Sequence, residues 1–178
     1  MALWTRSRTV TSIIPQVSGR VIEVAIGFRP GARVSKGDTL FVIDPSDYEL
    51  DVERTLAEIE VARSDLTQLE AEAAAEREIW EGQFPNRPIP DLIARVPQIA
   101  AVNARLQSAE AARRAAELAL SRTRVKAPFD ARVLETRLDV GQVVGTTAEV
   151  GTMFSLDSLE IAVSVSAAER RLIGPVTG

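Results

Sequence analysis

Short apolar segments and glycine-containing turns follow one another along two stretches of this 178-residue chain, at residues 13–45 and 125–157. Each stretch has the order turn, strand, glycine turn, strand, and each closes on an apolar strand, at residues 40–43 and 153–156. Short apolar segments bounded by turn residues predict β-strands. Because an isolated hairpin is only marginally stable in water, we expect the two stretches to pair as halves of one β module.

Between these halves, apolar side chains recur every three or four positions through residues 46–124. Heptad spacing over this length is typical of a coiled-coil seam. Since the chain must return to the same β module, we predict an antiparallel hairpin of two long α-helices. Folding the segment about Arg87-Pro88 places Leu66 beside Ala109. The predicted seam is formed by Ile59, Leu66, Leu69, Val102, Leu106 and Leu120.

A proline-rich turn is predicted to separate the helices, with the hairpin tip at about residues 81–96. Residues 82–90 contain three prolines, which cannot continue a helix. We expect a short helical piece over residues 91–95. A second long helix is predicted to begin near Pro97, because proline is tolerated in a first helical turn.

Aromatic residues are scarce in this chain, at 4% of positions, yet Trp80 and Phe84 both fall at the predicted end of the rod. Alanine supplies much of the apolar content between Ala57 and Ala119, which predicts slim helix packing with little core. The two aromatic side chains either plug the end of the hairpin or dock a partner. The two roles are compatible.

The composition excludes several kinds of chemistry. The chain has no cysteine and no histidine, which rules out disulfides, thiolate metal sites and histidine acid–base catalysis. The net charge of −4 and the absence of a basic run argue against a nucleic-acid partner. No stretch approaches the ~20 apolar residues of a membrane-spanning helix. Residues 1–12 lack the apolar core of a secretory signal and are expected to be loosely ordered.

Two sets of charged residues are candidates for functional sites. Lys36 and Lys126, the only lysines, lack the sequence context of a biotinylated or lipoylated lysine. An acidic cluster is formed by Glu70, Glu72, Glu76, Glu78 and Glu81. The arginines available to pair with it are Arg63, Arg77, Arg113 and Arg114. A two-helix rod offers no concave site, so we predict a solvated face, with no catalytic residue, cofactor or metal.

Local turn chemistry sets several boundaries. Pro30-Gly31 predicts a type II turn, and residues 35–38 predict a second turn that requires a positive φ. Asp44-Pro45-Ser46-Asp47 indicates a capped helix start. Residues 158–178 predict a strand over 159–165 followed by a short helix, and we expect the chain to be truncated there.

The two half-motifs around a helical hairpin resemble the periplasmic adaptors, or membrane fusion proteins, of bacterial tripartite efflux pumps, a haemolysin-D-like family. The resemblance rests on residues 15–21, 31–38, 43–48, 120–130, 140–142 and 159–161. It implies an α+β fold: a lipoyl-like β-sandwich in two sequence-separated halves, interrupted by the hairpin and followed by the start of a β-barrel domain. Ala131 stands where the family usually has glycine, so we expect a turn at this position, and a positive φ there would strain the alanine.

The resemblance implies an architectural function without catalysis. Such adaptors link an inner-membrane efflux transporter, usually of the resistance-nodulation-division (RND) class, to an outer-membrane exit channel. They lie in the periplasm, associated with the inner membrane, and self-associate into a ring, a trimer or a hexamer. The hairpin tip meets the channel, and this sequence places Trp80, Phe84, Arg87 and Ile89 there. The alternatives are a type I secretion adaptor, which the modest arms disfavour, and a biotin or lipoyl carrier, which a modified lysine would reveal.

Overall fold

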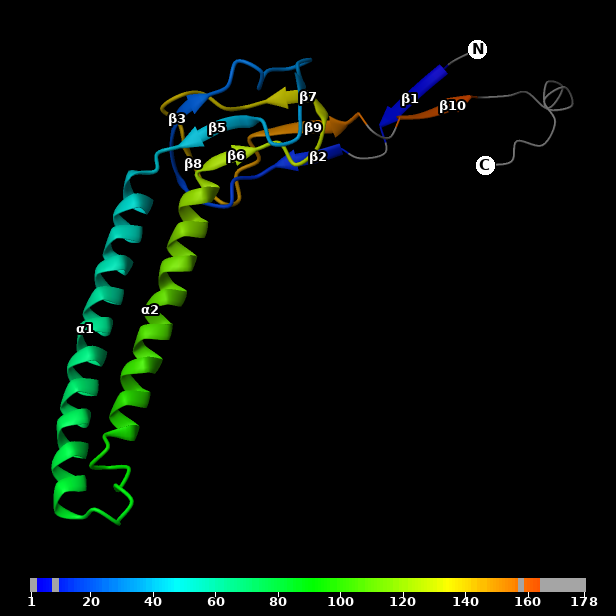
Figure 1. Ribbon diagram of the computed structural model, residues 1–178. Coiled ribbons are helices and arrows are strands. Elements are labelled where there is room, and N and C mark those ends of the chain that lie inside the picture. Colours follow the sequence, from blue (N-terminus) through cyan, green and yellow to red (C-terminus); the bar gives the residue numbers. More distant parts are fainter. Residues whose placement is uncertain (1–2, 8–9, 157–158, 164–178) are drawn as a thin grey trace, which may run out of the picture. The chain divides into compact units, whose positions relative to one another are not determined.

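The computed structural model describes residues 3–7, 10–156 and 159–163. The fold is α+β, and it divides into a β unit (Met1–Asp44 with Arg124–Gly178) and a helical unit (Pro45–Thr123). In Figure 1 the cyan-to-green helices form one unit, while the blue and the yellow-to-orange ends of the sequence meet in the other.

The strands of the β unit pair antiparallel throughout, in two four-stranded sheets and one two-stranded sheet. The strand orders are β2-β9-β7-β4, β6-β5-β3-β8 and β1-β10. The strands are β1 (Leu3–Ser7), β2 (Val10–Ile13), β3 (Gly19–Val24), β4 (Arg33–Val34), β5 (Thr39–Ile43), β6 (Arg124–Lys126), β7 (Ala131–Thr136), β8 (Val143–Val144), β9 (Gly151–Ser155) and β10 (Leu159–Val163).

Each four-stranded sheet takes strands from both halves of the sequence. Strand β4 of the first half pairs with β7 of the second, and β8 of the second pairs with β3 of the first. Each strand of the first half has a counterpart in the second half: β2 and β6, β3 and β7, β4 and β8, β5 and β9. Exchanging the members of every pair converts one strand order into the other. Neither half can therefore complete a sheet alone, and the predicted pairing of the two halves is confirmed.

The core of the β unit is formed by large side chains from both sheets. Phe41 and Ile43 from one sheet and Met153 and Val133 from the other are almost completely inaccessible to solvent. The ring of Phe28 stacks on Phe41 with 6.0 Å between centroids. Complete burial of a side chain of this size stabilises the fold by about 1.5–3 kcal/mol.

The predicted glycine turns are present. At Pro30-Gly31, the amide of Ala32 donates to the carbonyl of Arg29 over 3.0 Å, and Gly31 has φ +83°. Gly37 has φ +91° in the second turn, where the amide of Asp38 donates to the Ser35 carbonyl. The first of these is the geometry of a type II turn, in which the third position requires a positive φ.

The expectation for Ala131 is wrong. This residue opens strand β7 and is fully buried. Among the described residues Arg95 is the one non-glycine with a positive φ, so Ala131 has an ordinary strand backbone. Pairing with Val34 and Ser155 on either side keeps this position extended.

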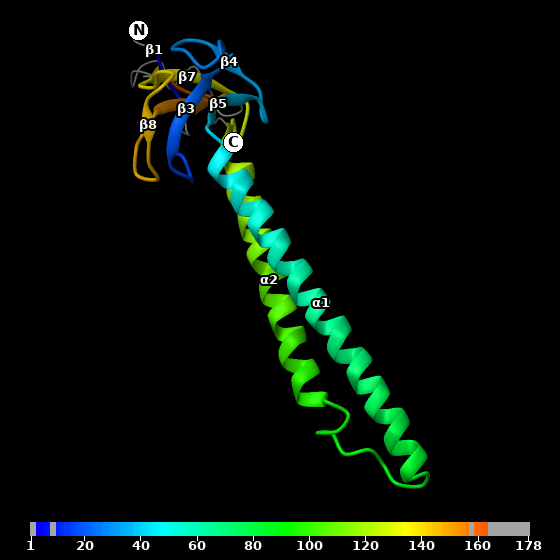
Figure 2. The same cartoon turned by 90° about the vertical axis from the view of Figure 1, so that its left-hand side faces the viewer.

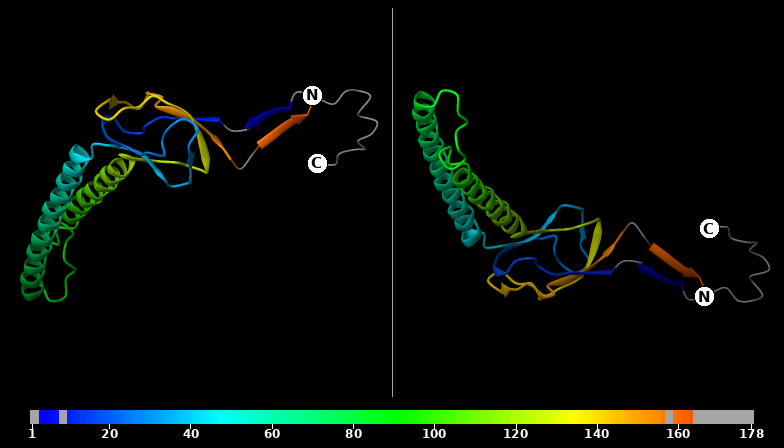
Figure 3. Two further views of the ribbon diagram at one scale, coloured as in Figure 1. Left: turned by 90° about the horizontal axis from the view of Figure 1, so that it is seen from above. Right: turned by 90° about the horizontal axis from the view of Figure 1, so that it is seen from below.

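The N-terminal segment differs from the loosely ordered one expected for residues 1–12. Strand β1 pairs with β10 over five positions, and β2 adds an edge strand to β9. Figure 3 shows the blue β1 and the orange β10 running beside each other. The strand expected over residues 159–165 corresponds to β10 at Leu159–Val163, and the helix expected over 166–173 lies outside the described residues.

The helical unit contains α1 (Ser46–Gln83) and α2 (Val96–Arg122), which lie side by side with opposite chain directions (Figures 1 and 2). Pro45 takes the N-cap position of α1, and carboxylates in the first turn favour the positive end of the helix dipole. Helix α2 starts with Pro97 in its first turn, as predicted. Residues 91–95 form hydrogen-bonded turns, and the short helix predicted there is absent from this described segment.

The inner face of α1 buries Thr55, Ile59, Ala62 and Ala73, whereas no residue of α2 is fully buried. The remaining predicted seam residues are half-buried: Leu66, Leu69, Val102, Leu106 and Leu120. The helices of this pair therefore contact each other along a thin, partly solvated stripe.

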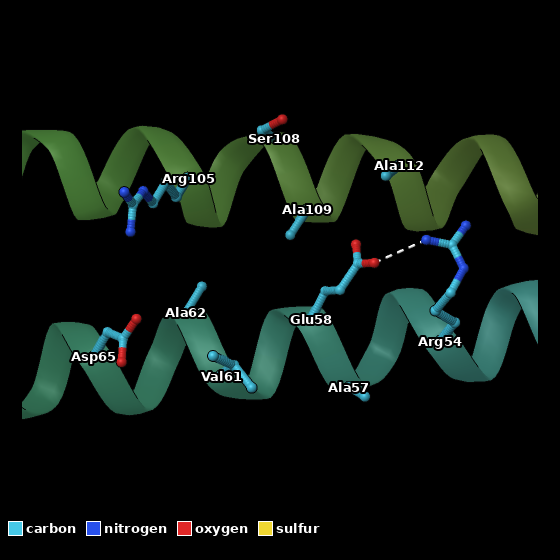
Figure 4. A pocket seen from close by; sticks show the side chains of 10 residues that line it. All are labelled: Arg54, Ala57, Glu58, Val61, Ala62, Asp65, Arg105, Ser108, Ala109 and Ala112. Carbon is cyan, nitrogen blue, oxygen red and sulfur yellow. Dashed lines mark hydrogen bonds and ion pairs between the residues drawn. The ribbon is translucent and has the colours of Figure 1, made fainter.

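The register of the two helices differs from the predicted one, in which Leu66 lies beside Ala109. Figure 4 shows Ala109 of α2 opposite the turn of α1 between Glu58 and Ala62. The arms are unequal, with 38 residues in α1 and 27 in α2, because residues 84–95 return without a helix. Folding the chain symmetrically about Arg87-Pro88 ignored this difference.

Candidate docking site at the hairpin tip

An aromatic cluster caps the far end of α1. The rings of Trp80 and Phe84 lie 4.5 Å apart between centroids, tilted by 42°. The guanidinium of Arg87 lies 5.7 Å from the centroid of Phe84, within the range of a cation–π interaction. The structure thus brings together three of the four residues predicted at the tip.

Backbone hydrogen bonds hold this cluster in place. The amide of Phe84 donates to the carbonyl of Trp80 over 2.7 Å, which closes the last turn of α1. The amide of Arg87 then donates to the Phe84 carbonyl over 3.0 Å, and the Trp80 indole Nε1 donates to the Arg87 carbonyl over 3.3 Å. Trp80 therefore ties the loop to the helix, while Phe84 and Arg87 remain exposed.

Ile89, the fourth predicted residue, lies on the return segment at residues 84–95 and is half-buried. The same segment exposes Leu92 and buries Ala94. On the return segment, Ile89 and Ala94 are therefore partly or wholly withdrawn from solvent, whereas Leu92 faces it.

Sequence reasoning missed the residue that fastens the return segment, Arg95. Its two guanidinium nitrogens contact Glu72 at 2.6 Å and Glu76 at 2.7 Å. Arg95 also takes the N-cap position of α2 with a left-handed backbone, φ 54°. One side chain therefore joins the start of α2 to two successive turns of α1.

Arg95 also changes the electrostatics of its partners. Its hydrogen bond lowers the pKa of Glu76, against a smaller opposing effect of desolvation. The bond to Glu76 in turn raises the pKa of Arg95 above its ordinary value. Both groups are therefore held in their charged forms.

The predicted partners of the acidic cluster need correction. Glu72 and Glu76 pair with Arg95, which the sequence analysis did not consider. Arg63 pairs with Glu60 and Glu110, and Arg113 pairs with Glu117. Glu72 and Glu76 are four residues apart, so both carboxylates lie on one face of the helix, where a single arginine can pair with both. This spacing does not indicate which arginine that is.

The described residues contain no group of three or more carboxylates arranged to hold a metal ion. In the same part of the chain, no helix is long and apolar enough to cross a membrane. What the tip presents to solvent is an aromatic ring with a guanidinium near its face and, on the return segment, the exposed side chain of Leu92.

Comparison with known proteins identifies the family. The family model described as "RND MFP, barrel-sandwich hybrid domain" matches residues 8–154. The chain belongs to this family. MFP denotes a membrane fusion protein, and the matched span includes both halves of the β unit and the hairpin between them.

Relatives and solved structures agree with this assignment. The chain is 26% identical to multidrug resistance protein MdtA of Escherichia coli (strain SMS-3-5 / SECEC), covering 92% of this chain and 41% of MdtA. It is 26% identical to the antibiotic efflux pump periplasmic linker protein ArpA of Pseudomonas putida, covering 93% and 40%. The chain therefore spans less than half the length of these curated relatives.

A solved MacA-MexA chimeric protein with the Pseudomonas aeruginosa MexA α-hairpin domain shares the fold. Its TM-score is 0.67 at 23% identity, with 96% of this chain and 57% of that chain covered. The likeness is one of fold, and it covers nearly the whole of this chain.

Proposed function

We propose that this chain is part of a periplasmic adaptor that links an inner-membrane efflux transporter to an outer-membrane exit channel. The family, and relatives named for multidrug resistance and antibiotic efflux, support this function. The observation that carries it is the hairpin itself, which ends in the exposed Phe84–Arg87 pair. The role is architectural, and the chain makes or breaks no covalent bond.

The parts of the chain divide this work. Residues 13–45 and 125–157 act as a lipoyl-like sandwich that packs into a ring with other copies. The hairpin, residues 46–124, spans distance, with its tip at about residues 81–96. Residues 158–178 open a β-barrel domain that couples to the transporter. The protein works in the periplasm, associated with the inner membrane.

The tip is proposed to bind the exit channel through Phe84 and Arg87, with Trp80 and Ile89 in support. Aromatic and arginine side chains are frequent energetic anchors of interfaces. The hydrogen bonds that fix the loop reduce the conformational entropy lost on docking. Trp80 holds the loop through its indole, so a substitution there would test the fold as well as docking.

The test is the double variant Phe84→Ala with Arg87→Glu in the full-length protein. We expect loss of export, measured as substrate accumulation in cells, and loss of crosslinking to the exit channel. The matched control is Arg77→Glu. It makes the same charge reversal at an exposed position of α1, outside the aromatic cluster at the tip. Normal export by a correctly expressed double variant would refute the docking role.

A further inference from the structure

The backbone of Arg95 has a conformation that glycine adopts more easily than arginine. Its φ of 54° lies in the left-handed region. The amide of Val96 donates to the carbonyl of Asp91 over 3.0 Å. The amide of Arg95 donates to the carbonyl of Leu92 over 3.3 Å. These two hydrogen bonds around a left-handed residue form a Schellman motif, in which the left-handed position is usually glycine. Any larger side chain at this position strains the backbone.

The side chain of Arg95 makes contacts that offset this strain. Its guanidinium contacts Glu72 and Glu76, on two successive turns of α1. Glu72 is itself oriented, because its Oε1 accepts a hydrogen bond from Gln68 while its Oε2 accepts one from Arg95. Strained backbones persist where surrounding contacts determine them, and they are frequent at functional sites. The chain thus keeps an arginine where glycine would form the turn more easily, and the ion pairs are what glycine could not supply.

The turn that Arg95 closes displays Leu92. This side chain is 72% exposed, more than any other large apolar side chain of the helical unit. The amides of Ile93 and Ala94 both donate to the carbonyl of Pro90, over 2.9 and 3.0 Å. Single exposed leucines are common on protein surfaces. What distinguishes Leu92 is a backbone that is fixed on both sides, by these bonds and by the Schellman motif.

Leu92 and the Phe84–Arg87 pair lie on one connection between the two helices. The first part of this connection is held by the Trp80 indole, and the second part is held by Arg95. Each part therefore combines an exposed apolar side chain with a fastening of its own. Side chains that are held in place before binding lose less conformational entropy on docking.

We propose that Arg95 is a positioning residue for docking, which holds Leu92 in place as a second anchor of the tip through its two ion pairs to α1. Leu92 then inserts into an apolar cleft of the partner, beside the contacts of Phe84 and Arg87. Arg95 itself does not touch the partner. This inference rests on the proposed docking of the tip, and it assigns a contact residue and a positioning residue outside the aromatic cluster.

Photocrosslinking tests the contact. A photoreactive benzoylphenylalanine replaces Asp91, an exposed neighbour of Leu92, in the full-length protein in cells that express the exit channel. We expect an adduct with the channel, and Leu92→Ser should lower its yield by about tenfold, the effect of removing one interface anchor. Leu50→Ser makes the same change at a leucine that is 62% exposed near the start of α1, and it should leave the yield unchanged. No adduct from protein that exports normally, or an equal yield in Leu92→Ser, would overturn the proposal.

Glycine at position 95 separates the backbone role of this residue from the role of its side chain. Arg95→Gly relieves the strain and keeps the hydrogen bonds of the Schellman motif, but it removes the guanidinium. We expect the adduct yield to fall as far as in Leu92→Ser, with the helix content by circular dichroism unchanged. If Arg95 served only the turn, glycine would dock as well as arginine or better. That result would overturn the positioning role.

A charge exchange distinguishes positioning from a general loss of structure. Arg95→Glu should lose the adduct, because it places a third carboxylate beside Glu72 and Glu76. Adding Glu76→Arg puts an arginine between two carboxylates again and should restore about half of the parental yield, since an exposed ion pair tolerates exchange of its partners. A defect unrelated to the ion pairs would not be restored. Absence of restoration would therefore count against the proposal.

The variants also separate this inference from the proposed function. If Phe84→Ala with Arg87→Glu abolishes export while Leu92→Ser and Arg95→Gly dock normally, the adaptor function stands and this inference falls. If Leu92→Ser loses docking and export while that double variant exports normally, Leu92 is the anchor and the assignment to Phe84 and Arg87 is refuted. Normal docking and export by every variant would refute both.

Discussion

The β unit and the hairpin are stabilised in different ways. In the β unit, side chains as large as Phe41 and Met153 are withdrawn from water between two sheets. In the hairpin, α2 has no fully buried residue, and ion pairs such as Arg95–Glu76 supplement a narrow seam. Exposed ion pairs contribute little to stability, so most of the folding free energy per residue belongs to the β unit.

The largest effect is expected in the β-unit core. Phe41→Ala should lower the free energy of unfolding by about 3–5 kcal/mol, because it removes the ring that stacks on Phe28 and leaves a cavity between the sheets. Chemical denaturation followed by circular dichroism measures this change. The control Ile26→Ala alters a side chain that is 83% exposed and should have almost no effect. Similar losses in both variants would contradict the description of the core.

The first residues of β3 and β7 provide a second test inside the β unit. Gly19 has φ +153°, and a Cβ atom placed there would lie 2.6 Å from Cγ2 of Ile43. Gly19→Ala should therefore destabilise the protein by about 2 kcal/mol through strain and crowding. Ala131→Gly at the matching position should also destabilise it, by about 0.5–1 kcal/mol, because Ala131 already has a strand backbone. Stabilisation by Ala131→Gly would restore the turn expected from sequence.

In the hairpin we expect a smaller effect from a harsher substitution. Leu66→Asp places a charge in a seam that is only half-buried, so the loss should fall near the low end of the range for buried leucines, about 2 kcal/mol. Thermal melting of the helical signal measures it. Leu50→Asp serves as the control and should leave the melting unchanged, because Leu50 is 62% exposed on α1. Equal destabilisation by both would contradict the assignment of inner and outer faces.

Periodicity in the sequence predicted which hairpin residues face inward, but it could not fix the register. A slip of one heptad leaves every seam position in the seam, so Leu66 and Ile59 are equally good partners for Ala109. The deciding information is the length of the non-helical return, residues 84–95, which depends on tertiary contacts.

Glycine turns were predictable because Gly31 and Gly37 adopt backbones that other residues avoid. Arg95 violates that same rule. Its left-handed backbone is maintained by ion pairs to Glu72 and Glu76, which precede it by 23 and 19 residues. No local signal in the sequence indicates such a conformation, and the tip site was therefore predicted without the residue that fastens it.

The smallest expected effect concerns this fastening and its dependence on pH. The pKa of Glu76 is lowered in the folded protein, chiefly by the hydrogen bond from Arg95. A lowered pKa means that the stabilising contact is fully present above the pKa of the unfolded chain and is lost as the pH falls through the folded pKa. Acidification should thus release the return segment while the β-unit core remains folded.

An NMR titration of the Glu76 carboxyl, with the backbone amide of Val96 as a reporter of the return segment, measures this release. In the parent protein the two signals should change together, since that amide donates to Asp91 within the segment that Arg95 fastens. In the Arg95→Gln variant, the Glu76 midpoint should move up toward the ordinary value for glutamate, and the amide should no longer follow it. An unchanged midpoint in Arg95→Gln would show that the ion pair does not hold the tip, leaving the Trp80–Arg87 hydrogen bond as its fastening.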